Sequence, residues 1–207
     1  MREIELTGDL RIPYPFAFRY LEAVINKIGY GTLFTNGRYK RYKELYVGAI
    51  TAQMLSTDMA DRFYVTSPDD DPPDFTLRQY KPHEDEPDKT DEVSYAFEVV
   101  DYTDHSPSIE AIIDAKLDRN YPENYNIVVL FKHSTETTYD YDHLVEKYHD
   151  QKRWILIIMR TARTASGILL NGDHWVVAAV SQPPVQRLIK PDKIDKPDFN
   201  QMLIHPH

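Results

Sequence analysis

The chain of 207 residues is long enough for one domain with a sizeable core, and its 42% hydrophobic and 28% charged residues are typical of a globular protein. It contains no cysteine, which excludes disulfide scaffolds and cysteine-based zinc sites. No apolar stretch reaches the roughly 18 residues of a membrane span. Residues 1–10 alternate charged and apolar side chains, unlike a signal peptide. We therefore expect a cytoplasmic protein that does not contact a membrane.

Charge is unevenly distributed along the chain. The net charge of −9 argues against strong non-specific binding to DNA. Residues 66–104 hold 13 Asp and Glu against 3 Lys and Arg, whereas residues 1–50 hold 8 basic against 5 acidic and residues 151–207 hold 8 against 4. This pattern fits a metal site between arms that face nucleic acid. It fits equally well an acidic surface loop on a protein with no nucleic-acid role.

Hydrophobic periodicity predicts two helices in the first part of the chain. The first covers residues 15–28 and is ended by Gly29 and Gly31, and the second covers residues 42–55. The apolar positions of the first helix form one stripe, which we expect to face the core: Phe16, Tyr20, Leu21, Val24 and Ile28.

Three strands are predicted next, at residues 63–66, 75–79 and 93–100. Residues 80–92, between the last two strands, are polar and acidic and contain two prolines. We expect this segment to be a mobile acidic insertion at the tip of a hairpin, exposed and dispensable for folding.

The second half of the chain alternates helices and strands. A helix is predicted to begin at Pro107, with Ser106 as its N-cap, and to end near Asn120. This order indicates a single α/β domain, residues 1–207, with a central mixed sheet flanked by helices. The remaining predicted elements are a strand at 127–131, a helix at 141–149, a strand at 154–159, a hairpin of strands at 167–170 and 174–180, and an extended tail at 182–207.

Two acidic strand segments and the helix after them carry the candidate chemistry. The first segment is Pro72-Pro73-Asp74-Phe75, and the second places Glu98 among apolar neighbours. The helix that follows carries Lys116 on or beside its apolar stripe. Two carboxylates on adjacent strands and a nearby ammonium can hold a divalent cation and prepare a water molecule to attack phosphate.

Over about residues 40–132, this arrangement resembles the PD-(D/E)XK nuclease-like superfamily. The resemblance implies a restriction-endonuclease-like core, with Asp74 and Glu98 as catalytic metal ligands for Mg²⁺ or Mn²⁺. Val100 occupies the position of the superfamily's strand lysine. In some members the following helix provides this lysine instead, so the resemblance implies Lys116 as the third catalytic residue. Glu44 matches the glutamate that a preceding helix often adds as a metal ligand.

Each of these residues also has an alternative role that is purely structural. Asp74 can cap the turn after its two prolines. Glu98 would be solvated on an edge strand, and Lys116 can extend its ammonium to solvent from the boundary of the core. Glu44 is interpreted as a solvated helix residue. Gln53, on the same helix, is a weaker candidate for lining the site.

Other motifs are weaker. Residues 38–43 interleave basic and aromatic side chains, a pattern that can hold a phosphate backbone and stack bases or can form a solvated loop. Arg160 and Arg163 are further phosphate-binding candidates, and Asp101, Asp104 and His105 form a second polar cluster. Histidine pairs at HExxH spacing, a phosphate-binding glycine loop and a nucleophile elbow are absent from the sequence. The nucleic-acid-binding candidates are Arg38, Lys40, Arg41 and Lys43.

The leading hypothesis is metal-dependent hydrolysis of phosphodiester bonds in nucleic acid. The main alternative is a non-catalytic interaction or regulatory module on the same fold, which the missing strand lysine and the acidic charge favour. A hydrolase of small phosphorylated compounds is a third hypothesis. Binding to a protein partner, including a second copy of this chain, is a further hypothesis.

Overall fold

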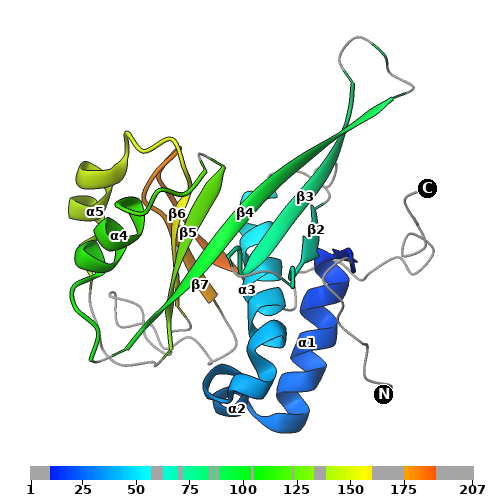
Figure 1. The fold of residues 1–207 in the computed structure, drawn as a ribbon. Coiled ribbons are helices and arrows are strands. Elements are labelled where there is room, and N and C mark those ends of the chain that lie inside the picture. The colour runs from blue at the N-terminus through cyan, green and yellow to red at the C-terminus, as the bar shows by residue number, and fades with distance from the viewer. Residues whose placement is uncertain are drawn as a thin grey trace. The chain divides into compact units, whose positions relative to one another are not determined.

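The computed structural model describes residues 10–56, 63–69, 72–83, 86, 89–103, 105–122, 124–132, 139–159 and 175–189. The chain forms two compact units, which divide between Tyr95 and Ala96, within what the sequence predicts as a single domain. Strands of the described residues form a mixed sheet in the order β1 to β8, flanked by α-helices (Figure 1). The predicted α/β class with a central mixed sheet is therefore confirmed.

The first unit is built from helices followed by antiparallel strands. Its strands β1, β2 and β3 pair in sequence order, each antiparallel to the next. Its described elements are β1 (Ile12–Pro13), α1 (Tyr14–Ile28), α2 (Tyr30–Thr35), a 3₁₀ turn η1 (Gly37–Tyr39), α3 (Lys40–Leu55), β2 (Phe63–Thr66), β3 (Phe75–Pro82) and the first half of β4 (Thr90–Tyr102).

The core-facing stripe of α1 differs from the predicted one. Gly29 ends α1 with φ +85°, a conformation that glycine adopts without strain, and its N–H donates to the carbonyl of Ile25. The chain then forms α2 at once, with Gly31 inside it, although Gly29 and Gly31 had predicted the end of helical structure. Of the predicted stripe, only Leu21 is fully buried, while Phe16 and Tyr20 are half-buried. The side chains of α1 that enter the core are Ala17, Phe18, Leu21 and Ile25.

Helix α3 is enclosed by the rest of the unit. From Glu44 to Ala52 every residue is buried, so the helix lacks the single apolar stripe of a surface helix. Gly48 lets it approach the sheet closely. A Cβ atom at Gly48 would lie 2.6 Å from Cγ1 of Val65 and 3.0 Å from Cδ2 of Phe75.

The β3–β4 hairpin is longer than predicted. Both strands continue into the segment expected to be a mobile insertion, so only residues 83–89 lie between them. The His83 N–H donates to the Lys89 carbonyl over 2.9 Å and helps to close the turn. Ion pairs stabilise this hairpin. Glu92 of β4 accepts a hydrogen bond from Arg78 of β3 and lies 3.0 Å from Arg11. Residues 80–82 and 90–92 were predicted as part of a loop because they are polar, but they belong to the two strands.

The second unit contains the parallel part of the sheet. Strands β4, β5 and β6 are parallel, and β7 and β8 add to β6 in antiparallel order. Its described elements are the second half of β4, α4 (Ile109–Leu117), β5 (Tyr125–Phe131), α5 (Tyr141–Tyr148), β6 (Ile155–Met159), β7 (Trp175–Ala179) and β8 (Val185–Ile189).

Two predictions for the C-terminal part require correction. Residues 185–189 are not an extended tail but strand β8, which pairs with β7. Strand β7, predicted as one arm of a hairpin, pairs with β6 and β8. The other predicted arm, residues 167–170, lies outside the described residues. Among the helices that the structure describes, none has the length and apolar character needed to cross a bilayer.

Buried polar side chains connect the strands of the second unit. Asn126 Nδ2 donates to the Ala96 carbonyl of β4 over 2.9 Å, and Asn126 Oδ1 accepts from the N–H of Trp154 over 2.8 Å, just before β6. Ser181 links the Ile155 N–H and the Arg153 carbonyl in the same way. These bonds satisfy groups whose burial would otherwise destabilise the fold.

Helix α4 starts later than predicted. Ser108, not Ser106, is its N-cap and accepts a hydrogen bond from the Ala111 N–H over 3.2 Å. The Ser106 hydroxyl instead accepts from the Thr103 N–H over 2.9 Å in the preceding turn. The two serines are only two residues apart, so both can cap a chain reversal there and the local sequence does not discriminate between them.

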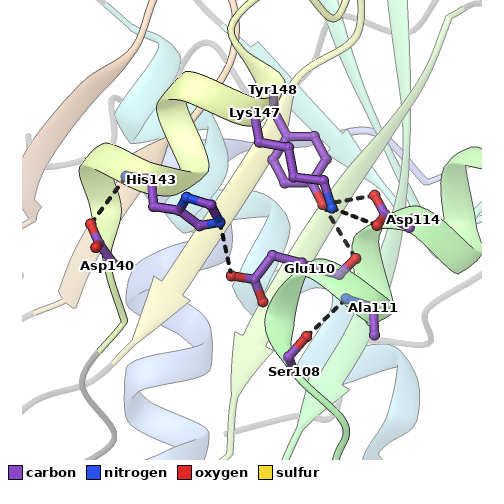
Figure 2. Close-up of polar contacts among 8 residues, drawn as sticks. All are labelled: Ser108, Glu110, Ala111, Asp114, Asp140, His143, Lys147 and Tyr148. Atoms are coloured by element: carbon purple, nitrogen blue, oxygen red, sulfur yellow. Dashed lines mark hydrogen bonds and ion pairs between the residues drawn. The ribbon is translucent and has the colours of Figure 1, made fainter.

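Polar contacts hold α4 against α5, as Figure 2 shows. The Tyr148 hydroxyl donates to Asp114 Oδ1 over 2.8 Å, and Lys147 Nζ lies 2.6 Å from Asp114 Oδ2. The Lys147 ammonium lowers the pKa of Asp114. Burial, followed by the bond to Asp114, raises the pKa of Tyr148 to about 12. The two helices also share the apolar core of this unit with β5, β6 and β7.

The close approach of α3 to the sheet predicts the effect of enlarging Gly48. Gly48→Ala should lower the free energy of unfolding by about 1–3 kcal/mol, because the added methyl group overlaps Val65 and Phe75. Gly31→Ala in α2 is the matched control, since a Cβ there meets nothing within 4 Å. The control should be neutral or more stable by up to about 1 kcal/mol. Urea unfolding measures both, and equal effects would contradict the packing described.

Candidate functional site

In the first unit, two carboxylates lie together beneath the end of the sheet. Glu44 on α3 is 4% exposed. Its Oε2 accepts from the Ser67 hydroxyl over 3.1 Å, at the end of β2. Lys40, one turn earlier on α3, places its ammonium 3.5 Å from Glu44 and 3.7 Å from Asp74 at the start of β3. We call Lys40, Glu44, Ser67 and Asp74 the Glu44 cluster.

Burial and like charge raise the pKa of Glu44. Desolvation raises it most and the Asp74 carboxylate raises it further, whereas Lys40 and Ser67 act in the opposite direction. The result is a pKa of about 7 for Glu44. Its Oε1 accepts no hydrogen bond from the described residues. At neutral pH this pair of carboxylates therefore favours a shared proton or an additional cation.

This geometry corrects the interpretation of Glu44 as a solvated residue. Glu44 is among the buried residues of α3. The helix begins with several basic residues, so the sequence pattern indicated a solvent-exposed first turn and did not reveal this burial. Gln53 is half-buried on the same helix, and its Oε1 also accepts no hydrogen bond from the described residues. Ser67 was missed in the sequence, where its only signal is its position directly after a strand.

In the second unit, Glu98 and Lys116 form a direct ion pair. Glu98 is 8% exposed on β4. Lys116 Nζ, in the last turn of α4, donates to Glu98 Oε1. Arg119 Nη1 lies 3.6 Å from the same oxygen and donates to the Tyr121 hydroxyl over 2.9 Å. Glu98 Oε2 is buried and accepts no hydrogen bond from the described residues. We call Glu98, Lys116, Arg119 and Tyr121 the Glu98 cluster.

Strand order and helix position explain why these residues meet. In the described sheet, β4 lies between β3 and β5, so Glu98 is central and is not solvated at an edge. Its partner in the parallel register is Ile127 on β5. Helix α4 connects these two strands and returns over the sheet, which brings Lys116 back to Glu98. The Lys116 side chain is 15% exposed and is paired, so it does not extend freely to solvent.

The Glu98 cluster contains more positive than negative charge. Two cations share one carboxylate oxygen, and the Arg119 side chain is 57% exposed. Burial, and next the Glu98 carboxylate, raise the pKa of Tyr121. The cluster can therefore accept an added anion at its exposed side. Arg119 and Tyr121 were missed because they lie beyond the regular part of α4, in a segment without a motif.

The predicted site residues are divided between the two units. Glu44 and Asp74 belong to the first, and Glu98 and Lys116 belong to the second. Each pair is brought together inside its own unit. The convergence of Asp74 with Glu98 and Lys116, within the reach of a shared cation, stays a prediction.

The basic residues expected to bind nucleic acid also have partners within the protein. Lys40 belongs to the Glu44 cluster, and Arg41 pairs with Asp69. Arg38 lies over the ring of Tyr39, 6.0 Å from its centroid. Lys43 is half-buried on α3. Their role toward nucleic acid stays a prediction.

The second polar cluster predicted from the sequence is only partly described. Asp101 pairs with Lys132 over 2.6 Å, and His105 is exposed. Asp104, Arg160 and Arg163 lie outside the described residues. Within the described part of the chain, no group of three or more His, Asp or Glu side chains is arranged to hold a metal ion.

A scan against protein-family models and searches of curated proteins and of solved structures find no match for this chain. Its function is therefore inferred from its own residues and their contacts.

The raised pKa of Glu44 predicts how stability depends on pH in metal-free buffer. The folded protein keeps the Glu44 proton up to about pH 7, whereas the unfolded chain loses it near 4.5. This contribution is complete below pH 4.5 and is lost as the pH rises through 7, with a total of about 3 kcal/mol. Glu44→Gln should lack it, so its stability relative to wild type should increase across this window.

Urea unfolding at several pH values between 4 and 8 measures this difference. Glu86→Gln is the control, because Glu86 is an exposed glutamate of the same unit. The control should change the pH dependence of stability less than Glu44→Gln does. Parallel curves for Glu44→Gln and Glu86→Gln would contradict the geometry of the Glu44 cluster.

The buried Glu98–Lys116 pair predicts a strong energetic coupling. Lys116→Met should lower the free energy of unfolding by about 2–4 kcal/mol, because it leaves the Glu98 carboxylate buried with Arg119 as its remaining cation. The double variant with Glu98→Gln should be more stable than Lys116→Met alone, with a coupling above about 1 kcal/mol. Lys132→Met, in the more exposed pair with Asp101, should cost less than about 1 kcal/mol. Additive effects of Lys116→Met and Glu98→Gln would contradict a direct pair.

Proposed function

We propose that this protein is a metal-dependent nuclease that hydrolyses phosphodiester bonds in nucleic acid. The observation that supports it most is the contact of Lys116 with Glu98. The strand position of the expected lysine is Val100, and an ammonium from the following helix reaches the strand glutamate instead. A lysine beside an acidic strand residue is what the PD-(D/E)XK resemblance requires. Nucleic acid is then the partner, and the expected cytoplasmic location belongs to the same proposal.

The chemistry of these carboxylates suits a hard divalent cation such as Mg²⁺ or Mn²⁺, although no three His, Asp or Glu side chains of the described residues converge to hold one. Each cluster has a buried carboxylate oxygen without a hydrogen-bond donor, Oε1 of Glu44 and Oε2 of Glu98, within the described residues. Carboxylate oxygens are the ligands that Mg²⁺ prefers. Asp74, Glu98 and Glu44 would hold the cation, which when bound supplies Lewis-acid polarisation of the phosphate and of a water ligand. The resemblance assigns both clusters to one centre, and this assignment is part of the proposal.

The chain's own cations have separate tasks in this mechanism. Lys116 orients the attacking water and holds positive charge where the phosphorane-like negative charge develops. Arg119 extends from the same cluster with an exposed guanidinium, whose planar donors suit two phosphate oxygens. The Tyr121 hydroxyl, which accepts from Arg119, keeps this guanidinium close to Glu98.

A non-catalytic interaction module on the same fold is the second candidate. Two observations favour it: Val100 stands at the lysine position, and a group of three metal-binding side chains is absent from the described residues. Metal binding separates the two candidates, because a cation that binds the folded state preferentially raises the melting temperature.

The nuclease proposal predicts metal-dependent cleavage that depends on both clusters. The purified protein should cut single- or double-stranded DNA or RNA with Mg²⁺ or Mn²⁺ and not with EDTA. Asp74→Asn, Glu98→Gln and Lys116→Met should each reduce the cleavage rate by about a hundredfold or more. A gel assay with labelled substrates measures the rate, and calorimetry measures the metal-dependent melting temperature.

Lys132→Met serves as the control for removing a paired lysine in the same unit. It should keep the wild-type rate. Absence of cleavage on all four substrates, together with a melting temperature that the metals do not change, would exclude the nuclease and favour the interaction module.

A further inference from the structure

Four aromatic rings form a continuous row on the surface of the first unit. Phe16 and Tyr20 lie one turn apart on α1, with centroids 6.3 Å apart and planes within 13°. Tyr20 stacks on Tyr42 of α3 at 6.5 Å and 23°, and Tyr42 meets Tyr39 of η1 edge-on at 6.0 Å. Figure 1 shows α1 and α3 side by side, so the row crosses from one helix to the other. We call these four residues the aromatic row.

The aromatic row is separate from the core. Helix α1 packs into the unit through Phe18, Leu21 and their neighbours, which are fully buried. The four rings of the row are half-buried, so each presents part of its surface to solvent. Phe16 and Tyr20 belong to the apolar stripe that the sequence predicted for the core and that the fold leaves at its surface. Burial in the core therefore does not account for the whole surface of these two rings.

The helices around the row are positively charged in an acidic protein. Residues 10–56 contain seven Lys and Arg against two Glu, although the whole chain carries a net charge of −9. Both glutamates are engaged within the unit: Glu22 accepts from the Tyr46 hydroxyl, and Glu44 is buried. Arg38 is exposed and lies over the Tyr39 ring at the end of the row. Arg19 and Lys43 lie on the same two helices.

We propose that the aromatic row binds single-stranded nucleic acid, with bases stacked on its rings and phosphates held by Arg38, Lys43 and Arg19. Partly exposed aromatic rings next to cations are the combination that single-strand binding proteins use, because every base has a π-face and every nucleotide a phosphate. The proposal rests on the nuclease function and adds the substrate class: a single strand, or an unpaired segment.

The charge of the two helices and the exposure of the rings favour a single strand over a duplex or a protein partner. In a duplex the base faces are covered by neighbouring base pairs, so the rings could not stack on them. The surplus of Lys and Arg over Glu in residues 10–56 favours a polyanion at α1 and α3, where Asp69 and Asp74 of the acidic segment already pair with Arg41 and Lys40. A protein partner would gain from the rings but would need an acidic surface to match the surplus of Lys and Arg. A single strand satisfies both conditions at once.

The test is fluorescence anisotropy with labelled 12-nucleotide oligothymidylate and oligouridylate, in EDTA and about 50 mM salt, where affinity from phosphate contacts is high. Wild type should bind at least one of them and should bind the corresponding duplex much more weakly. Tyr20→Leu/Tyr42→Leu keeps apolar side chains but removes two stacking rings. It should raise Kd at least about tenfold, since one stacked base corresponds to roughly a five- to 150-fold change. Arg38→Gln should weaken binding and reduce its salt dependence.

The matched control is Tyr64→Leu/Tyr80→Leu, a second pair of contacting tyrosines in the same unit, with Arg11 beside Tyr80. This tyrosine pair lies next to the acidic Glu92. Its replacement should leave Kd within about twofold of wild type. Circular dichroism melts confirm that both double variants fold. Equal loss in both variants, equal affinity for duplex, or no binding by wild type overturns the proposal. The last result, with self-association or partner capture that the row variant abolishes, would assign the row to protein docking.

Binding in EDTA requires no catalysis, so the two proposals fail separately. Oligonucleotide binding that depends on the row, without cleavage under any metal condition, would leave this inference standing and remove the nuclease. Cleavage that Tyr20→Leu/Tyr42→Leu does not slow at limiting substrate concentration would keep the nuclease and overturn the role of the row.

Discussion

A carboxylate on a central strand must be paired, and this constraint organises the second unit. Glu98 lies on β4, which has a neighbouring strand on each side, and it is only 8% exposed. Its burial is tolerated because Lys116 returns from α4 to the same oxygen and Arg119 adds a second cation. The second carboxylate oxygen, Oε2, accepts no hydrogen bond within the described residues.

The position of Lys116 depends in turn on how α4 is held. Tyr148 and Lys147 of α5 both contact Asp114, two residues before Lys116, and the apolar sides of both helices enter a shared core. This support is rigid, because it combines packing with hydrogen bonds to a charged acceptor. The Glu44 cluster shows the same principle in the first unit, where an enclosed helix brings one carboxylate close to another and raises its pKa.

Acidic and basic residues are separated along the chain. The basic helices of the first unit carry half-buried aromatic rings, whereas 13 Asp and Glu lie between residues 66 and 104 of the sequence. The two sets meet where Arg41 pairs with Asp69 and Lys40 lies 3.7 Å from Asp74, and a polyanionic ligand would be attracted to the basic residues of the helices. The net charge of the protein therefore does not describe the surface that such a ligand would meet.

The sequence by itself determined most of the elements. Apolar runs located β5 and β6, periodicity located α1, α3 and α5, and the Pro-Asp and Phe-Glu segments located the carboxylates. These signals are local, since side-chain period and capping depend on nearby residues. The sequence could not show that Glu44 is buried, that Arg119 and Tyr121 join Glu98, or that residues 185–189 form a strand. It also assigned Phe16 and Tyr20 to the core. Tertiary structure decided these points, because burial and pairing depend on residues far apart in the chain that only the fold brings together.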